Sequence, residues 1–450
     1  MRFKEKILGV LKGLQLSRRF FMAGGIVIAL TALSFAIPIL FPLSQGLLAI
    51  LMLTAIADSM LLFSKANGFK ARRHTLKLLS LGDANTMSIT IENKLPFRVN
   101  TVVFDELPIQ LQTRDFQMSH TFEAGKSHTF SFEINPLTRG EYHFGRTNIL
   151  ATSRIGLVAR RFKIKTNTSI PAFPSIVQMK KYELLAFAKT STLEGIKKVR
   201  RLGHSYEFEH IKPYVQGDDI RSINWKATSR RNTLMVNQYE DERSQQMYAI
   251  IDKSRVMHMP FNGLTLLDYA INSSLVIANI ALKKHDRAGL ITFSNSVGST
   301  IKADKGANQL KKILHALYNE KSFVREANYD LLYRASKNII SSRSLIFLFT
   351  NFESTFAMER ALPVLRKINH HHLLVVIIFE NSELIDYSQK KVESLSDIYT
   401  QTTAEKLVLE KKQITHRMRK EGIQTILSKP EDLSINTVNK YLELKSKGLT

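Results

Sequence analysis

The sequence of 450 residues contains no cysteine and is poor in acidic side chains. Without cysteine the chain has no disulfide, no thiolate metal ligand and no cysteine nucleophile, and it suits a reducing compartment such as the cytoplasm. Its 39 acidic residues are outnumbered by 64 Lys and Arg residues, which gives a formal net charge of +25. Such a charge favours anionic surroundings, which include nucleic acid, an anionic bilayer surface and an acidic protein.

The chain also lacks the common catalytic sequence motifs. It has no Gly-x-x-x-x-Gly-Lys-Ser/Thr phosphate loop, no His-Glu-x-x-His helix and no Gly-x-Ser-x-Gly nucleophile turn. We therefore expect a protein that binds rather than an enzyme. The length and a hydrophobic content of 44% are typical of a folded chain with two or three domains.

Two apolar runs without Lys, Arg or Glu lie near the N terminus, after a basic segment at residues 1–19. The first, residues 20–41, would form roughly 33 Å of helix, enough to cross a bilayer core. Residues 42–46 are expected to form a tight turn, and residues 47–63 supply a second, shorter run. The sequence therefore predicts a two-helix transmembrane hairpin at residues 20–63.

Basic residues stand on both sides of this hairpin, including Arg18 and Arg19 before it and Lys65 after it. The positive-inside rule then predicts a multi-pass protein of an inner membrane, with both termini and the bulk of the chain cytoplasmic. A twin-arginine export signal is the less favoured interpretation, because a second apolar run follows directly. Asp58 lies within that second run, where it either reaches the membrane interface or pairs with Lys65, or else has a functional role.

Residues 70–175 contain short alternating runs, such as Met87–Ile91, Thr101–Phe104 and His128–Phe132. Runs of this kind, separated by turn residues, are typical of antiparallel strands. We therefore expect an immunoglobulin-like β-sandwich that serves as a spacer.

A dense group of polar side chains lies in residues 195–242, around the only tryptophan of the chain, Trp225. Glycine followed by two aspartates indicates a turn, and the tryptophan is expected to bury a large apolar area. Two interpretations stay open: a structural joint between neighbouring domains, and a surface that docks a partner through its arginines. The candidate residues are Tyr214, Gly217, Asp218, Asp219, Arg221, Asn224, Trp225, Thr228 and Arg230.

Buried apolar runs alternate with helical patterns in residues 245–450. Such alternation predicts an α/β doubly wound sheet. We expect strands at residues 248–251, 288–293, 345–349, 373–379 and 423–427, and helices at residues 264–284, 309–318, 356–368, 404–420 and 436–445.

Polar residues follow two of these strands at their carboxyl ends, where doubly wound sheets bind ligands. Asp252 and Ser254 follow the first strand, and Asn351 follows the strand that ends at Phe349. Their oxygens are the kind that Mg²⁺ prefers, so Mg²⁺ is the one candidate cofactor. The alternative is a vestigial site whose polar residues serve the loop or a protein partner.

The sequence around Trp225 resembles the domain of unknown function 58 family. Residues 217–219 (Gly-Asp-Asp), Arg221, residues 223–225 (Ile-Asn-Trp) and residues 228–230 (Thr-Ser-Arg) match the family core, with serine where the family usually has alanine. The resemblance implies a von Willebrand factor A-like domain at residues 245–450. It also implies a bacterial protein that works with a MoxR-type AAA ATPase in the assembly or maturation of other proteins.

By the same resemblance, Asp252, Ser254 and Asn351 correspond to a degenerate metal-ion-dependent adhesion site. Val256 stands in place of its second serine, and Asn351 in place of an aspartate.

Together these features predict a membrane-tethered cytoplasmic adaptor that binds the lipid bilayer, a MoxR-type AAA ATPase and a protein client. One alternative is a cation-dependent hydrolase that uses Asp252, Asp218 and Asp219; another is a structural envelope protein without an ATPase partner. Nucleic acid is not an expected partner, because the basic helices near the C terminus carry no recognised binding module. Three adjacent histidines, His370, His371 and His372, are expected to form a surface turn rather than a metal site.

Overall fold

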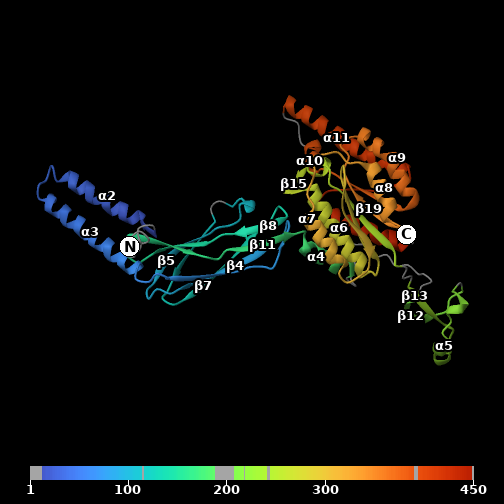
Figure 1. Cartoon of the computed structure of the whole chain (residues 1–450), viewed down its shortest axis with the longest axis horizontal. Helices are drawn as coiled ribbons and strands as arrows, with labels where there is room; N and C mark the ends of the chain where they lie inside the picture. The colour runs from blue at the N-terminus through green and yellow to red at the C-terminus, as the bar shows by residue number, and fades with distance from the viewer. Residues whose placement is uncertain are drawn as a thin grey trace. The chain divides into compact units, whose positions relative to one another are not determined.

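The computed structural model describes residues 13–113, 116–187, 207–216, 218–240, 244–389 and 394–447. The chain divides into two compact units, Met1–Ala172 and Phe173–Thr450. The first unit contains two helices and a β-sandwich, and the second contains an α/β sheet and a small β-hairpin (Figure 1).

The two N-terminal helices, α2 (Arg18–Leu33) and α3 (Leu40–Leu62), lie side by side (Figure 1). In the described part of the chain, α3 is the one helix with the length and composition to cross a membrane. The 16 residues of α2 give about 24 Å of helix, less than the roughly 30 Å of a bilayer core. The prediction of a multi-pass hairpin with spans at residues 20–41 and 47–63 is therefore corrected to one long apolar helix, a single candidate anchor.

The turn between these helices lies at residues 34–39 and not at residues 42–46, as the sequence had indicated. Ser34 ends α2, and its backbone N–H donates to the carbonyl of Leu30 at 3.0 Å. Pro42 is the third residue of α3. Proline is tolerated there because the first N–H groups of a helix have no partner within the helix.

The β-sandwich consists of a five-stranded sheet (β1-β10-β9-β5-β6) and two three-stranded sheets (β2-β4-β7 and β3-β11-β8). The predicted sandwich-like arrangement is confirmed, and the three strands predicted from the sequence lie in β4, β5 and β7. Alternate residues of β4 are buried, including Met87, Ile89 and Ile91. The strands are β1 (Leu14–Leu16), β2 (Phe69–His74), β3 (Leu79–Ser80), β4 (Asn85–Asn93), β5 (Val99–Asp105), β6 (Gln117–Phe122), β7 (Ser127–Ile134), β8 (Gly140–Phe144), β9 (Thr147–Thr152), β10 (Val158–Ile164) and β11 (Thr168–Phe173).

A turn between β9 and β10 joins the sandwich to α3 through Asp58. The Asp58 carboxylate is fully buried and accepts a hydrogen bond from the Ser153 hydroxyl. It also accepts from the backbone N–H groups of Leu157 at 3.0 Å and Val158 at 2.9 Å. Of the two structural options for Asp58, the ion pair with Lys65 is not formed, since the turn holds this carboxylate.

Arg160 closes the end of the same helix. Its guanidinium donates to the carbonyls of Leu62 at 2.7 Å and Lys65 at 2.8 Å. The charged group also lies over the ring of Phe63, 4.4 Å from the ring centroid. A cation here satisfies carbonyls that a helix end leaves without partners.

The second unit is built on a six-stranded sheet in the order β18-β17-β14-β19-β20-β21. All neighbours are parallel except β17 and β18, so the sheet is mixed. The predicted α/β class is confirmed at this level. The strands are β14 (Gln246–Asp252), β17 (Arg287–Phe293), β18 (Val297–Asp304), β19 (Leu345–Phe349), β20 (Leu373–Phe379) and β21 (Gln424–Ser428).

Helices cover both faces of this sheet (Figure 1). Residues of α4, α6, α7 and α12 pack on one face, and residues of α8, α9 and α11 pack on the other. Within β14, Ala249 belongs to the first core and Ile250 to the second, because neighbouring strand residues point to opposite faces. The helices are α4 (Ile176–Phe187), α6 (Leu266–Lys283), α7 (Gln309–Asn319), α8 (Tyr329–Ile339), α9 (Thr355–His371), α10 (Ser382–Gln389), α11 (Leu395–Lys420) and α12 (Leu433–Lys447).

Candidate functional site

The carboxyl ends of β14 and β19 bring together four polar side chains that we call the strand-end cluster: Asp252, Ser254 and Thr350, which are buried, and Tyr329, which is partly buried. The Asp252 carboxylate accepts from the Thr350 hydroxyl at 2.7 Å and from the Ser254 backbone N–H at 2.9 Å. The hydroxyl of Tyr329 lies 2.9 Å from that of Thr350.

Burial away from water shifts the pKa values of two groups in this cluster, Asp252 and Tyr329. Burial raises the pKa of Asp252, and the hydrogen bonds from Ser254 and Thr350 oppose that rise only in part. Burial, reinforced by the charge of Asp252, raises the pKa of Tyr329 well above its usual value. The tyrosine is therefore a neutral hydrogen-bonding group at physiological pH.

Asn351, the third predicted site residue, follows Thr350 but is held by a different partner. Its side-chain oxygen accepts from the ammonium of Lys411 on α11 at 2.7 Å, and the same ammonium donates to the Phe352 carbonyl. Burial lowers the pKa of Lys411 to about 8, although Glu410 and Glu353 act in the opposite direction. The structure therefore uses this amide to fasten a loop to α11.

These residues do not fit a divalent cation. Both carboxylate oxygens of Asp252 already accept hydrogen bonds, and the oxygen of Asn351 faces a lysine ammonium. Ser254 Oγ is buried without a hydrogen-bond partner, but one hydroxyl is far short of the several oxygen ligands that Mg²⁺ requires. Within the residues that the structure describes, no three His, Cys, Asp or Glu side chains are grouped to hold a metal.

We expect Mg²⁺ to leave the melting temperature of the wild-type protein unchanged. We expect the same result for the Asp252→Ala variant. The physical reason is that protein donors already occupy the carboxylate oxygens that a cation would need. Differential scanning fluorimetry in millimolar Mg²⁺ and in EDTA tests this expectation. A saturable Mg²⁺-dependent rise that is lost in D252A would instead establish a metal site.

The polar motif around Trp225 forms a separate hairpin of β12 (Glu207–Pro213) and β13 (Met235–Glu240), joined through the short helices η2 (Ile220–Ser222) and α5 (Trp225–Arg231). Most of its polar residues satisfy backbone groups in these turns. Asp219 accepts from the Arg221 N–H, and Asn224 accepts from the Ala227 N–H, each at 3.0 Å.

Further motif residues stabilise the same hairpin. Asp218 accepts from Lys212 Nζ at 2.8 Å and from the Val215 N–H at 2.9 Å, and these bonds lower the pKa of its carboxyl group. The Thr228 hydroxyl accepts from the Met235 N–H at 3.0 Å. The backbone N–H of Tyr214 donates to the Leu234 carbonyl at 2.8 Å. Gly217 lies outside the described residues.

Trp225 is 69% exposed, so the expectation that it buries a large apolar area is wrong. It is the first residue of a seven-residue helix on a two-stranded hairpin, and such a hairpin has no core of its own. Ile220 and Val215 are also exposed, to 70% and 62%.

These exposed side chains form what we call the hairpin tip: Val215, Ile220, Arg221, Trp225 and Arg230. Both arginines of the tip are exposed, and they stand beside apolar groups that lack a covering layer within this hairpin. The tip thus combines cationic and apolar surface.

Sequence reasoning missed two residues of the strand-end region. Tyr329 begins α8, a helix that the sequence pattern did not indicate, and Lys411 is one of many lysines on α11. The helical spacing of the apolar residues Leu332, Ala335 and Ile339 within α8 was the available signal for the first. For the second no local pattern exists, because Lys411 meets Asn351 only through the packing of α11.

The region that contains the hairpin and most of the sheet is similar in sequence to a known protein family. Residues 210–423 match the family described as "Protein of unknown function DUF58". "Uncharacterized protein YeaD" of Bacillus subtilis (strain 168) is 25% identical over 192 residues, which cover 41% of this chain and 48% of that relative. The match thus spans about half the length of the relative.

Solved structures give weaker similarities. BatB from Bacteroides thetaiotaomicron matches 45% of this chain and 99% of its own, with 11% identity and a TM-score of 0.28. The PapD-like domain 7 of human CEP192 matches 24% of this chain and 87% of its own, with 12% identity and a TM-score of 0.19. Residues 210–423 of this chain therefore resemble the DUF58 family in sequence.

Proposed function

We propose that this protein is a membrane-anchored adaptor that docks a protein partner through its hairpin tip. The observation that carries the proposal is the exposure of Trp225 and Ile220 beside Arg221 and Arg230. Tryptophan and arginine are the side chains most often responsible for binding energy at protein interfaces. The flanking cations favour an acidic partner surface with an apolar pocket.

The strand-end cluster is a poor candidate for direct contact with a partner. Asp252 and Thr350 are fully buried, and Ser254 is 1% exposed. A partner would have to open the loops to reach them. We therefore assign partner binding to the hairpin tip rather than to the strand-end cluster. The hydrogen bonds of the cluster keep the surrounding loops in place.

The partner that we propose is a MoxR-type AAA ATPase, which the family resemblance implies. It would supply ATP hydrolysis for the assembly or maturation of a client protein, since no phosphate-loop motif occurs in the sequence. The hydrolase alternative has less support, because Asp218, Asp219 and Asp252 each accept hydrogen bonds from neighbours in their own loops.

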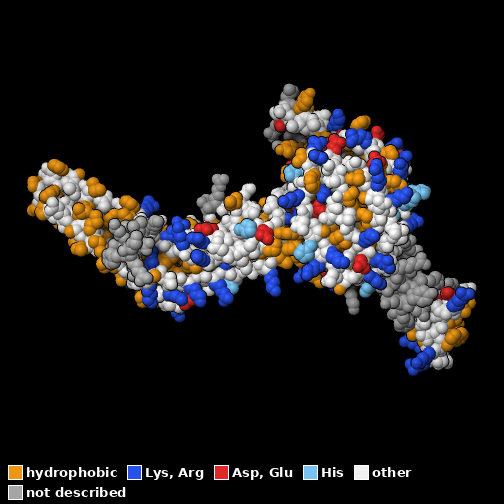
Figure 2. Space-filling view, in the orientation of Figure 1, with side chains coloured by type: hydrophobic (Ala, Val, Ile, Leu, Met, Phe, Trp, Pro, Cys, Tyr) orange, Lys and Arg blue, Asp and Glu red, His pale blue; other side chains and the backbone are white. Residues whose placement is uncertain are grey.

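The anchor in this proposal is α3, placed in a bacterial inner membrane. Most of its surface is exposed and apolar, as Figure 2 shows for the helices at the N-terminal end. Lys65, Lys70 and Arg72 follow the helix, and cations in that position favour the cytoplasmic side for the residues after it.

Replacement of Trp225 by alanine is expected to reduce copurification of a MoxR-type ATPase with the detergent-solubilised chain by about tenfold or more. The effect arises because an exposed aromatic anchor is lost while the hydrogen bonds of the hairpin are kept. Crosslinking before purification, followed by quantitative mass spectrometry, measures the ATPase recovered per chain. Arg221→Gln is expected to weaken recovery and to reduce its salt dependence.

The matched control is Ile109→Ala, which truncates a side chain that is 92% exposed in the first unit. Recovery of the ATPase should be unchanged in this variant. Equal recovery from wild type and W225A would refute docking by the tip, and absence of any such ATPase after crosslinking would favour the structural envelope protein.

A further inference from the structure

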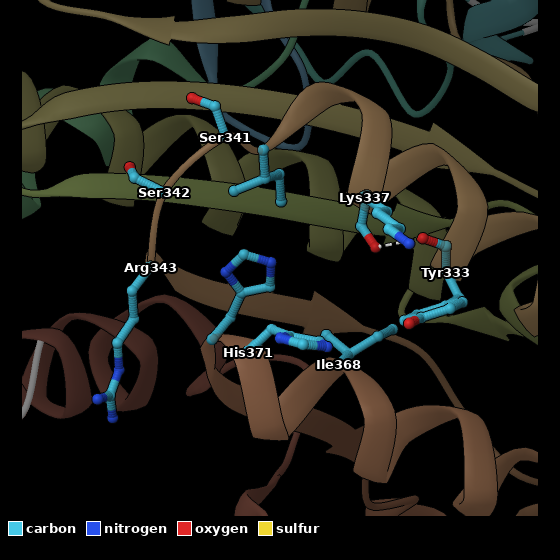
Figure 3. A pocket seen from close by; sticks show the side chains of 10 residues that line it. Tyr333, Lys337, Ser341, Ser342, Arg343, Ile368 and His371 are labelled. Carbon is cyan, nitrogen blue, oxygen red and sulfur yellow. Dashed lines mark hydrogen bonds between the residues drawn. The ribbon is translucent and has the colours of Figure 1, made fainter.

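A cavity of about 230 Å³ lies beside the start of β19, at the opposite end of that strand from the strand-end cluster (Figure 3). It is bounded by the last turns of α8 and α9 and by the loop that leads from α8 into β19. Figure 3 shows Tyr333 and Lys337 on α8, and Ser341, Ser342 and Arg343 along that loop. The complete lining is Tyr333, Ser336, Lys337, Ile340, Ser341, Ser342, Arg343, Ile368, His371 and His372.

The inner wall of this cavity contains a polar atom without a partner. Ile340 and Ile368 are buried there, and His372 is 9% exposed. The Nδ1 atom of His372 is buried and has no hydrogen-bond partner among the described residues. A buried polar atom of this kind destabilises the fold unless something in the cavity satisfies it. This indicates a polar occupant.

The outer wall is cationic. Lys337, Arg343 and His371 are exposed, and no acidic residue lines the cavity. In the part of the chain that the structure describes, neither Lys337 nor Arg343 forms an ion pair with a carboxylate. The hydroxyl groups of Ser341 and Ser342 add hydrogen-bond donors.

We propose that this cavity binds a small dianionic phosphate, either inorganic phosphate or the phosphate group of a small phosphomonoester. Lysine and arginine supply charge, the serine hydroxyls supply neutral donors, and His372 supplies a ring nitrogen at the inner wall. Burial, His371 and Arg343 lower the pKa of His372, and a bound dianion would favour the protonated ring. A volume of about 230 Å³ admits a phosphate group with a small substituent.

Isothermal titration of the detergent-solubilised full chain with inorganic phosphate tests this site. We expect saturable binding to wild type, and about tenfold weaker binding to Arg343→Gln and to Lys337→Gln, because each loses a charge-assisted contact. Lys312→Gln removes an exposed lysine of α7 and the same net charge, and should bind as wild type does. Parallel titration with glycerol 3-phosphate tells whether a substituent is accepted.

His372→Phe gives an independent test, because it removes the ring nitrogens and keeps a ring of similar size. Phosphate binding should be lost in this variant, while its melting temperature without phosphate shows that the domain is folded. The proposal is overturned if wild type shows no saturable heat, or if chloride at equal ionic strength reproduces it. Equal affinity in wild type, R343Q and K337Q would overturn it as well.

Discussion

Replacement of Asp105 by alanine is expected to destabilise the β-sandwich by about 3–5 kcal/mol, because it leaves the guanidinium of Arg73 buried without a counter-charge. The two side chains are 0% and 1% exposed, and their closest atoms are 2.5 Å apart. Arg73 also donates to the carbonyls of Thr166 at 2.7 Å and Gly145 at 3.1 Å. The Thr147 hydroxyl donates to Asp105 at 2.8 Å, so the substitution also removes its acceptor.

Hydrogen exchange of the full-length chain measures this effect within the sandwich alone. Amides of β4, β5 and β9 should exchange about a hundredfold faster or more in D105A, since each 1.4 kcal/mol changes the open population tenfold. The surface pair Arg98 and Glu123, 3.4 Å apart and more than half exposed, supplies the control. Glu123→Ala should cost at most about 1 kcal/mol.

Replacement of both partners gives a further check on the buried pair. The double variant Arg73→Met and Asp105→Leu should be more stable than D105A, because no unpaired charge remains in the interior. Similar exchange rates in D105A and E123A would contradict the expected cost. In the sequence Arg73 stands shortly after the second apolar run, whereas the fold buries it in the sandwich.

The sheet of the second unit was the most predictable part of the structure. The apolar runs at residues 345–349 and 373–379 coincide with β19 and β20. A parallel strand covered on both faces has to be continuously apolar, so its sequence identifies it directly. By contrast, β18 alternates between partly buried and exposed residues, and that edge strand was missed.

The site was predictable only in part. Strand ends were read correctly, so Asp252 and Asn351 were assigned to the same edge of the sheet. Their partners were not, because Lys411 approaches Asn351 from a helix 60 residues further along the chain. The exposure of Trp225 was also missed, since the sequence indicates an aromatic side chain but not whether a neighbouring layer covers it.

The connection between the anchor helix and the sandwich is expected to depend on Asp58. The Asp58→Asn variant replaces one carboxylate oxygen with an NH₂ group in a position that faces the Ser153 hydroxyl or the N–H groups of Leu157 and Val158. The variant loses the negative charge of the carboxylate and places an NH₂ donor opposite another donor. This should cost about 2–4 kcal/mol of stability in the turn, since hydrogen bonds to charged groups contribute about 1.5–3 kcal/mol each. The turn at residues 153–158 should then open about thirtyfold more often or more.

Trypsin cleavage after Arg154 reports this opening, because that residue lies exposed within the turn. Cleavage of the full chain in detergent should accelerate in D58N and remain slow in Thr54→Ala. Thr54 stands one helical turn before Asp58, and its hydroxyl donates to the carbonyls of Ile50 and Leu51 within its own helix. Unchanged cleavage in D58N would mean that Arg160, through the carbonyls of Leu62 and Lys65, holds the helix end without the carboxylate.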